Sequence, residues 1–183
     1  MMQEEASPVK EYLFDYISKS QKIPQLISQQ KYSEVINDII VNCYDKAITL
    51  SEKSEALGIL ATGILHYLLT NALINSQRKI EFHGTEIDIV IPDIKTLEKD
   101  PKKTLIICIP KTTNTDTIVK QLSQLEKIQP EKQNIWVVLS EKINLQNKSY
   151  IIGNQNDSFS RIIFDIGQFI NVQGQNKFKI LKI

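Results

Sequence analysis

An aspartate and a lysine stand near the ends of two segments that have the composition of neighbouring strands. Asp88 lies in the alternating segment from Glu86 to Pro92, and Lys111 follows the apolar run from Leu105 to Ile109. A carboxylate is an oxygen ligand of the kind that Mg²⁺ takes, and a positioned ammonium group stabilises negative charge that develops on a substrate. The two residue types therefore predict chemistry on an anionic substrate, if the fold brings them together.

Two glutamates are candidates to complete such a site. Glu86 lies two residues before Asp88, roughly 6 to 7 Å away along a strand and on the same face. Glu55 lies near the start of a long apolar segment, where the helix dipole also favours an acid without any chemistry. Glu86 and Asp88 have an ordinary interpretation as well, because charged residues on the solvated face of an antiparallel strand are normal.

Period-2 alternation predicts the strands that position Asp88. Lys79 to His83 and Glu86 to Pro92 alternate around His83-Gly84-Thr85, where Gly84 can adopt the positive φ of a tight hairpin. Alternation places Ile87, Ile89 and Ile91 on one face of the second strand, and Glu86, Asp88 and Val90 on the other. The next apolar run, Leu105 to Ile109, has no polar face and is typical of a strand buried at the centre of a sheet.

Helical periodicity dominates the first part of the chain. Ser7 and Pro8 predict the start of a helix, Pro24 interrupts the helical pattern, and a second apolar stripe begins at Tyr32, so these helices form a hairpin. Ser51 is a candidate cap for a third helix that is apolar on nearly every face, as expected of a helix enclosed by other elements.

The second half of the chain predicts one more helix and further strands. A lysine-rich loop, 94–103, precedes the central strand; after that strand a helix starts near Thr113 or Asn114, and a buried strand covers 134–139. Beyond Ser149, the segments SYIIG, RIIFDIGQFI and KFKILKI are interpreted as strands or a short helix. The fold class is therefore α/β.

The order of these elements, with GTEIDIVIPD followed by LIICIPKT, resembles the PD-(D/E)xK nuclease superfamily, and within it archaeal Holliday junction resolvases and small restriction-endonuclease-like proteins. The resemblance covers about residues 51–140. It implies a restriction-endonuclease-like αβββαβ core, with a mixed central sheet flanked by helices and the N-terminal helical hairpin added to it.

The resemblance also implies a function. Asp88 matches the metal-binding aspartate, Lys111 the lysine, and Glu55 the assisting helical glutamate, so the implied catalytic residues are Asp88, Lys111, Glu55 and Glu86, with Asp88 and Glu86 as ligands of Mg²⁺ or Mn²⁺. DNA is the implied partner. A homodimer is expected by analogy, because two sites can then meet two strands.

One position departs from the pattern. The acid expected two residues before Lys111 is replaced by Ile109, and Pro110 removes a ladder donor. Glu86, Glu81 or Asp93 could supply the missing carboxylate. Two hypotheses therefore remain: a metal-dependent nuclease with an altered site, or a catalytically inactive nuclease-like scaffold that binds partners.

Composition limits the remaining choices. The 183 residues carry 22 basic and 21 acidic side chains, so a net charge of +1 provides no global attraction for polyanions. Cys43 and Cys108 lie in apolar runs, as buried thiols of a reducing compartment do, and no span of about 20 apolar residues occurs. We expect a cytoplasmic protein without membrane contact, with a helical extension at 1–48 and a nuclease-like domain with a C-terminal strand extension at 49–183.

Overall fold

A five-stranded mixed sheet forms the centre of the computed structural model, which describes residues 6–153 and 158–178. The strands are β1 (Gln77–Phe82), β2 (Thr85–Ile91), β3 (Leu105–Cys108), β4 (Ile135–Leu139) and β5 (Ser149–Ile151), and they lie side by side in that order. Pairing is antiparallel from β1 to β3 and parallel from β3 to β5. The predicted central place of the third strand is confirmed.

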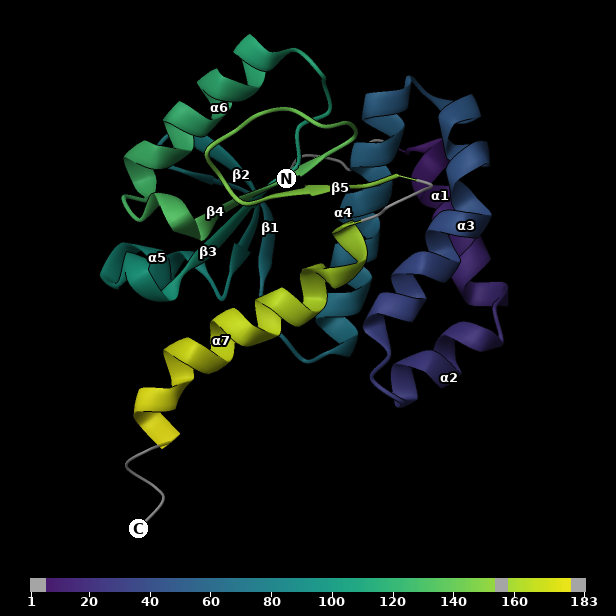
Figure 1. The fold of residues 1–183 in the computed structure, drawn as a ribbon, viewed down its shortest axis with the longest axis horizontal. Coiled ribbons are helices and arrows are strands. Elements are labelled where there is room, and N and C mark those ends of the chain that lie inside the picture. The colour runs from purple at the N-terminus through teal and green to yellow at the C-terminus, as the bar shows by residue number, and fades with distance from the viewer. Residues whose placement is uncertain (1–5, 154–157, 179–183) are drawn as a thin grey trace.

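Helices cover both faces of this sheet (Figure 1). They are α1 (Pro8–Lys19), α2 (Lys22–Ser28), α3 (Tyr32–Leu50), α4 (Lys53–Asn71), α5 (Ile94–Lys99), α6 (Thr115–Ile128) and α7 (Ile162–Phe178). The helices α1 to α4 and α7 share one apolar core with one face of the sheet, and α5 and α6 share another with the opposite face. The order α4-β1-β2-β3-α6-β4 is the predicted restriction-endonuclease-like αβββαβ core.

The helix α4 connects the N-terminal helices to the sheet. Gly63 lets α1 approach closely, because a Cβ atom there would lie 2.5 Å from Leu13 Cδ2. The cap of α4 is Glu52, whose carboxylate accepts hydrogen bonds from the amides of Ser54 and Glu55, so the prediction of Ser51 as cap was wrong. Ser51 is extended and instead donates its hydroxyl to Glu55 Oε2.

The N-terminal helices follow the predicted hairpin with one addition. Ser7 caps α1 by accepting from Lys10 N, and α1 and α3 pack against each other and against α4. Pro24 does not end a helix but lies in the first turn of the short α2, where its missing N–H costs little. The division at residues 48 and 49 stays a prediction, because α3 and α4 contribute to the same core.

Two segments differ from the sequence prediction in their secondary structure. The lysine-rich segment is not an open loop but forms α5, capped by Asp93, and the 3₁₀ turn η1 (Pro101–Lys103). The segment RIIFDIGQFI lies in η3 (Ser158–Arg161) and α7, so the helical alternative is confirmed, in a longer helix than expected, and the strand alternative was wrong. Strand structure is confirmed for β5, and the end of KFKILKI lies outside the described residues.

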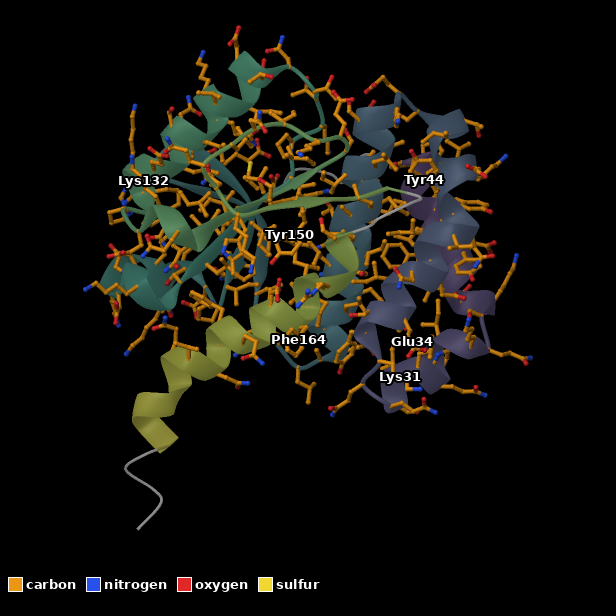
Figure 2. The ribbon with its side chains drawn as sticks, in the orientation of Figure 1. Lys31, Glu34, Tyr44, Lys132, Tyr150 and Phe164 are labelled. Carbon is orange, nitrogen blue, oxygen red and sulfur yellow. The ribbon has the colours of Figure 1, made fainter. Side chains whose placement is uncertain are left out.

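The helix α7 is held at its start and then extends away from the body (Figure 1). Tyr150 of β5 donates its hydroxyl to Asp165 Oδ2 at 2.7 Å, and Lys148 Nζ lies 3.2 Å from the same oxygen. Figure 2 shows Tyr150 at the junction of the sheet and α7, and the exposed Phe164 on α7. Residues 162, 163 and 166 bury the inner face of α7 at helical spacing. That spacing, rather than β-branched composition, decides its structure.

No helix among the described residues is both long and apolar enough to cross a membrane. Cys43 and Cys108 are buried and free, as predicted.

Candidate functional site

The regular alternation of side chains between the two faces of the sheet breaks at Asp88 in the β1-β2 hairpin. The ladder pairs Arg78 with Ile89 and Ile80 with Ile87. The residues between them, Lys79 and Asp88, are not a ladder pair, and Lys79 has a φ of 48°. A non-glycine residue with this φ interrupts regular strand geometry.

The side chains of β2 are buried in different cores before and after this position. Ile87 and Val90 pack in the core on the α6 side, whereas Ile89 and Ile91 pack in the core on the α4 side. The prediction that Ile87, Ile89 and Ile91 share one face was therefore wrong, because strict alternation fails at the irregular position. Asp88 lies at this break. The hairpin turn itself is as expected, with φ of 49° at His83 and 74° at Gly84.

The Asp88 carboxylate takes the place of a ladder acceptor. Its Oδ2 accepts a hydrogen bond of 2.7 Å from Ile109 N, one residue after β3 ends at Cys108. The next residue, Pro110, has no N–H to continue the ladder, which explains why the strand ends here. Ile109 is 2% exposed and belongs to the α4-side core. The position at which the resemblance requires an acid is thus filled by a core side chain.

The backbone of Lys111 is fixed against α4. A Cβ atom at Gly58 would lie 3.1 Å from Lys111 Cγ and 3.5 Å from the Pro110 carbonyl oxygen. Ser54 Oγ lies 3.2 Å from the Lys111 carbonyl oxygen and shares its single hydroxyl hydrogen between that oxygen and the Glu52 carboxylate. A serine and a glycine one turn apart on α4 therefore hold the segment after β3 and leave room for the lysine stem. Lys111 remains exposed to solvent.

Charges from three segments act on Asp88. The pKa of Asp88 is raised to about 6, chiefly by burial and also by the Glu86 charge, while the Ile109 amide and the Lys111 and Lys79 charges reduce the rise. The carboxylate is therefore ionised at pH 7.5 and becomes neutral as the pH falls through about 6. Lys111 lies within electrostatic range of Asp88 despite Pro110.

Lys79 was missed in the sequence analysis. The signal was present, because the two-residue turn at His83 and Gly84 places residues 79 and 88 at the same level of the hairpin. Once the turn is assigned, counting outward from Phe82 and Thr85 reaches Lys79 and Asp88. The positive φ of Lys79 could not be read from composition.

The predicted acids are placed differently from one another. Glu86 is exposed, faces Glu81 across the ladder and acts on Asp88. Glu55 is exposed in the first turn of α4 and accepts a hydrogen bond of 2.8 Å from Ser51 Oγ. Asp93 caps α5 by accepting from Thr96 N at 2.7 Å. Across 6–153 and 158–178, no three His, Cys, Asp or Glu side chains gather as a metal-binding group.

The chemistry of the side chains around Asp88 fits Mg²⁺ in ligand type and number. Oδ2 of Asp88 accepts a hydrogen bond from Ile109 N, and the charge of the Glu86 carboxylate acts on Asp88. Mg²⁺ is commonly held by one or two carboxylates together with water and substrate phosphate oxygens. Asp88 and Glu86 match that number of carboxylates and are oxygen ligands of the kind that Mg²⁺ takes.

The comparisons with known proteins give a distant likeness in fold. No family model matches the chain, and no curated protein matches it. Among solved structures, the chain is similar to the restriction endonuclease PspGI in complex with substrate DNA, at 17% identity and a TM-score of 0.48. The similarity covers 89% of this chain and 73% of that one.

Proposed function

We propose that this chain is a nucleic-acid-binding protein that holds a phosphodiester at the break in the β1-β2-β3 sheet. The observation that carries the proposal is geometric: Asp88 Oδ2 accepts from Ile109 N, two residues before Lys111, and Lys79 lies at the level of Asp88 in the β1-β2 hairpin. Cations fixed around one position bind a phosphate group, which carries the negative charge of every nucleic acid. DNA is the nucleic acid that we propose, following the sequence resemblance.

Hydrolysis is the activity that such a site would support. Asp88 and Glu86 would hold Mg²⁺ or Mn²⁺, which when bound activates water and neutralises charge on the phosphate. Lys111 would contact the scissile phosphate and stabilise the negative charge that develops there. Lys79 would hold the same phosphate from the β1 side. In this proposal Glu86 rather than Glu55 completes the site, because Glu86 acts on Asp88.

A second candidate function is a nuclease-shaped module that binds partners without cutting. The burial of Ile109 favours it, since the usual second acid of the site is replaced by core packing. The bond from Ile109 N also commits one oxygen of Asp88 to the backbone. In this alternative the two lysines bind an anionic partner, and no metal is required.

A cleavage assay separates the two candidates. Labelled linear, single-stranded and four-way-junction DNA, and RNA, are incubated with Mg²⁺ or Mn²⁺ and the protein, its Asp88→Asn variant or its Lys111→Ala variant. Matched controls are Asp116→Asn and Lys120→Ala on the exposed face of α6. Cutting that only the first two substitutions abolish supports hydrolysis at Asp88. Absence of cutting on every substrate, with binding retained, supports the noncatalytic module.

The homodimer and the cytoplasmic location stay predictions. Light scattering after size-exclusion chromatography, with and without DNA, tests the first of them.

A further inference from the structure

A polar cleft lies where the end of α4 meets the start of β1. Its volume is about 500 Å³. His66 and Thr70 of α4, Asn75 and Ser76 of the following turn, and Arg78 of β1 supply its polar lining. None of the residues that line this cleft is acidic. The cleft therefore suits an anionic group that accepts several hydrogen bonds.

The cleft and the Asp88 site share the same two elements. On β1, Arg78 pairs with Ile89, the residue after Asp88, while the next residue, Lys79, acts on Asp88 itself. On α4, Gly58 contacts Lys111, and His66 lies two turns further along. At about 1.5 Å per residue, the two points on α4 are roughly 12 Å apart. One extended ligand could therefore contact both places.

We propose that this cleft binds a second phosphate of the nucleic-acid strand whose scissile phosphate lies at Lys111. At a rise of about 3.4 Å per nucleotide, roughly 12 Å corresponds to three or four nucleotides along the strand. Arg78 supplies the planar fork that pairs with two phosphate oxygens, and His66 supplies a ring N–H. The inference rests on the proposed function, because the second phosphate belongs to the same strand.

Thr70 has a supporting role. Its hydroxyl donates to the His66 carbonyl oxygen at 2.8 Å, so its hydrogen is used within α4. Arg78 carries a permanent charge on a planar fork, so it is expected to dominate phosphate binding in the cleft, with His66 second.

Binding is measured by fluorescence anisotropy of a labelled DNA strand over a series of salt concentrations, in EDTA so that no cleavage occurs. The variants are Arg78→Gln, His66→Gln and Arg78→Lys, and the control is Arg161→Gln, a change at the other arginine of the chain. Thermal unfolding verifies that each variant is folded. Inorganic phosphate is titrated separately, with the His66 ring signals followed by NMR.

Arg78→Gln should weaken strand binding about fivefold to tenfold and lower the slope of log affinity against log salt by about 0.7 to 0.9, the change for one phosphate contact. Arg78→Lys should retain the slope and lose part of the affinity, because it keeps the charge without the fork. Arg161→Gln should change neither quantity.

Three outcomes would overturn the inference. Unchanged affinity and slope in folded Arg78→Gln, with strand binding intact, would remove the second phosphate site and leave the proposed function standing. Tight binding of inorganic phosphate at His66 without an effect of Arg78→Gln on the strand would assign the cleft to free phosphate. Failure of the unsubstituted protein to bind any strand would overturn the inference and the proposed function together.

Discussion

The two halves of the β2-β3 pair are held together by different interactions. In one half, residues 89–91 pair regularly with 105–107 and are buried on both faces of the sheet. In the other half, the partner of the Ile109 amide is the Asp88 carboxylate, and Glu86, Lys79 and Lys111 bring charge to that end. The regular half is organised by apolar burial, and the irregular half holds a carboxylate at a cost in stability.

The largest expected effect lies in the regular half. Ile107→Ala removes a fully buried side chain at the centre of β3 and should lower the free energy of unfolding by about 2 to 5 kcal/mol. Val119→Ala, at an exposed position of α6, should change it by less than about 0.5 kcal/mol. Urea denaturation measures both. Equal effects of the two substitutions would mean that the regular half is not the stabilising one.

Removing the charge of Asp88 in the irregular half should raise the free energy of unfolding rather than lower it. The pKa of Asp88 is about 6 in the folded protein and about 3.8 without its surroundings, so between these values the folded state binds more protons than the unfolded state. Stability from this group is therefore present at low pH and is lost as the pH rises through about 4 to 6. An asparagine in place of Asp88 would keep an oxygen that accepts from Ile109 N.

Asp88→Asn should accordingly raise the free energy of unfolding at pH 7.5 by about 1 to 3 kcal/mol, since one pKa unit corresponds to about 1.4 kcal/mol. At pH 4 the gain should largely vanish. Subtracting the pH profile of the variant from that of the unsubstituted protein isolates this group from acids whose pKa is lowered, such as Asp93. If Asp88→Asn is less stable than the unsubstituted protein at pH 7.5, the carboxylate stabilises the fold and is not retained at a cost in stability.

A substitution at Gly58 should change the position of Lys111 with little effect on stability. Gly58→Ala gains about 1 kcal/mol of helix propensity but places a Cβ atom 3.1 Å from Lys111 Cγ, so the free energy of unfolding should stay within about 1 kcal/mol of its original value. Nucleic-acid affinity should fall about twofold to fivefold because the lysine stem must move.

The matched control is Gly167→Ala in α7, where an added Cβ atom has no neighbour within 4 Å. It should stabilise the protein and leave affinity unchanged. Identical affinities for the two alanine variants would remove the role assigned to Gly58.

The smallest effect is expected at Glu55. Its exposed carboxylate accepts from Ser51 and is not part of a three-acid group with Asp88 and Glu86, so Glu55→Gln should change stability by less than about 0.5 kcal/mol and leave any cleavage rate intact. Glu86→Gln should reduce cleavage and weaken the dependence on Mg²⁺. If instead Glu55→Gln reduces cleavage and Glu86→Gln does not, Glu55 rather than Glu86 is the second acid of the site.

Much of this arrangement could be predicted from sequence because it follows from burial. The uniformly apolar segments identified α4 and the central strand, and the glycine turn fixed the hairpin. The fold class follows from these elements, whereas the pairing of Lys111 with Asp88 was implied by the family resemblance.

The parts that could not be predicted depend on backbone geometry and long-range contacts. Lys79 has a positive φ at the level where the alternation of β2 breaks and Ile87 packs on the α6 side, and no local sequence pattern indicates this break. Glu52 replaces Ser51 as cap because Ser51 is extended at the end of α3. The β-branched start of α7 suggests a strand until its packing against α3 is known.

The most direct test of the account is the affinity of Lys111→Ala for a DNA strand, compared with Lys120→Ala on the exposed face of α6. Both substitutions remove one positive charge, so a difference between them reports position and not net charge. If a phosphate lies at Lys111, Lys111→Ala should weaken binding about tenfold and lower the salt slope by nearly one, whereas Lys120→Ala should retain the original affinity. Equal affinities for the two variants would contradict a phosphate site at the irregular half of the sheet.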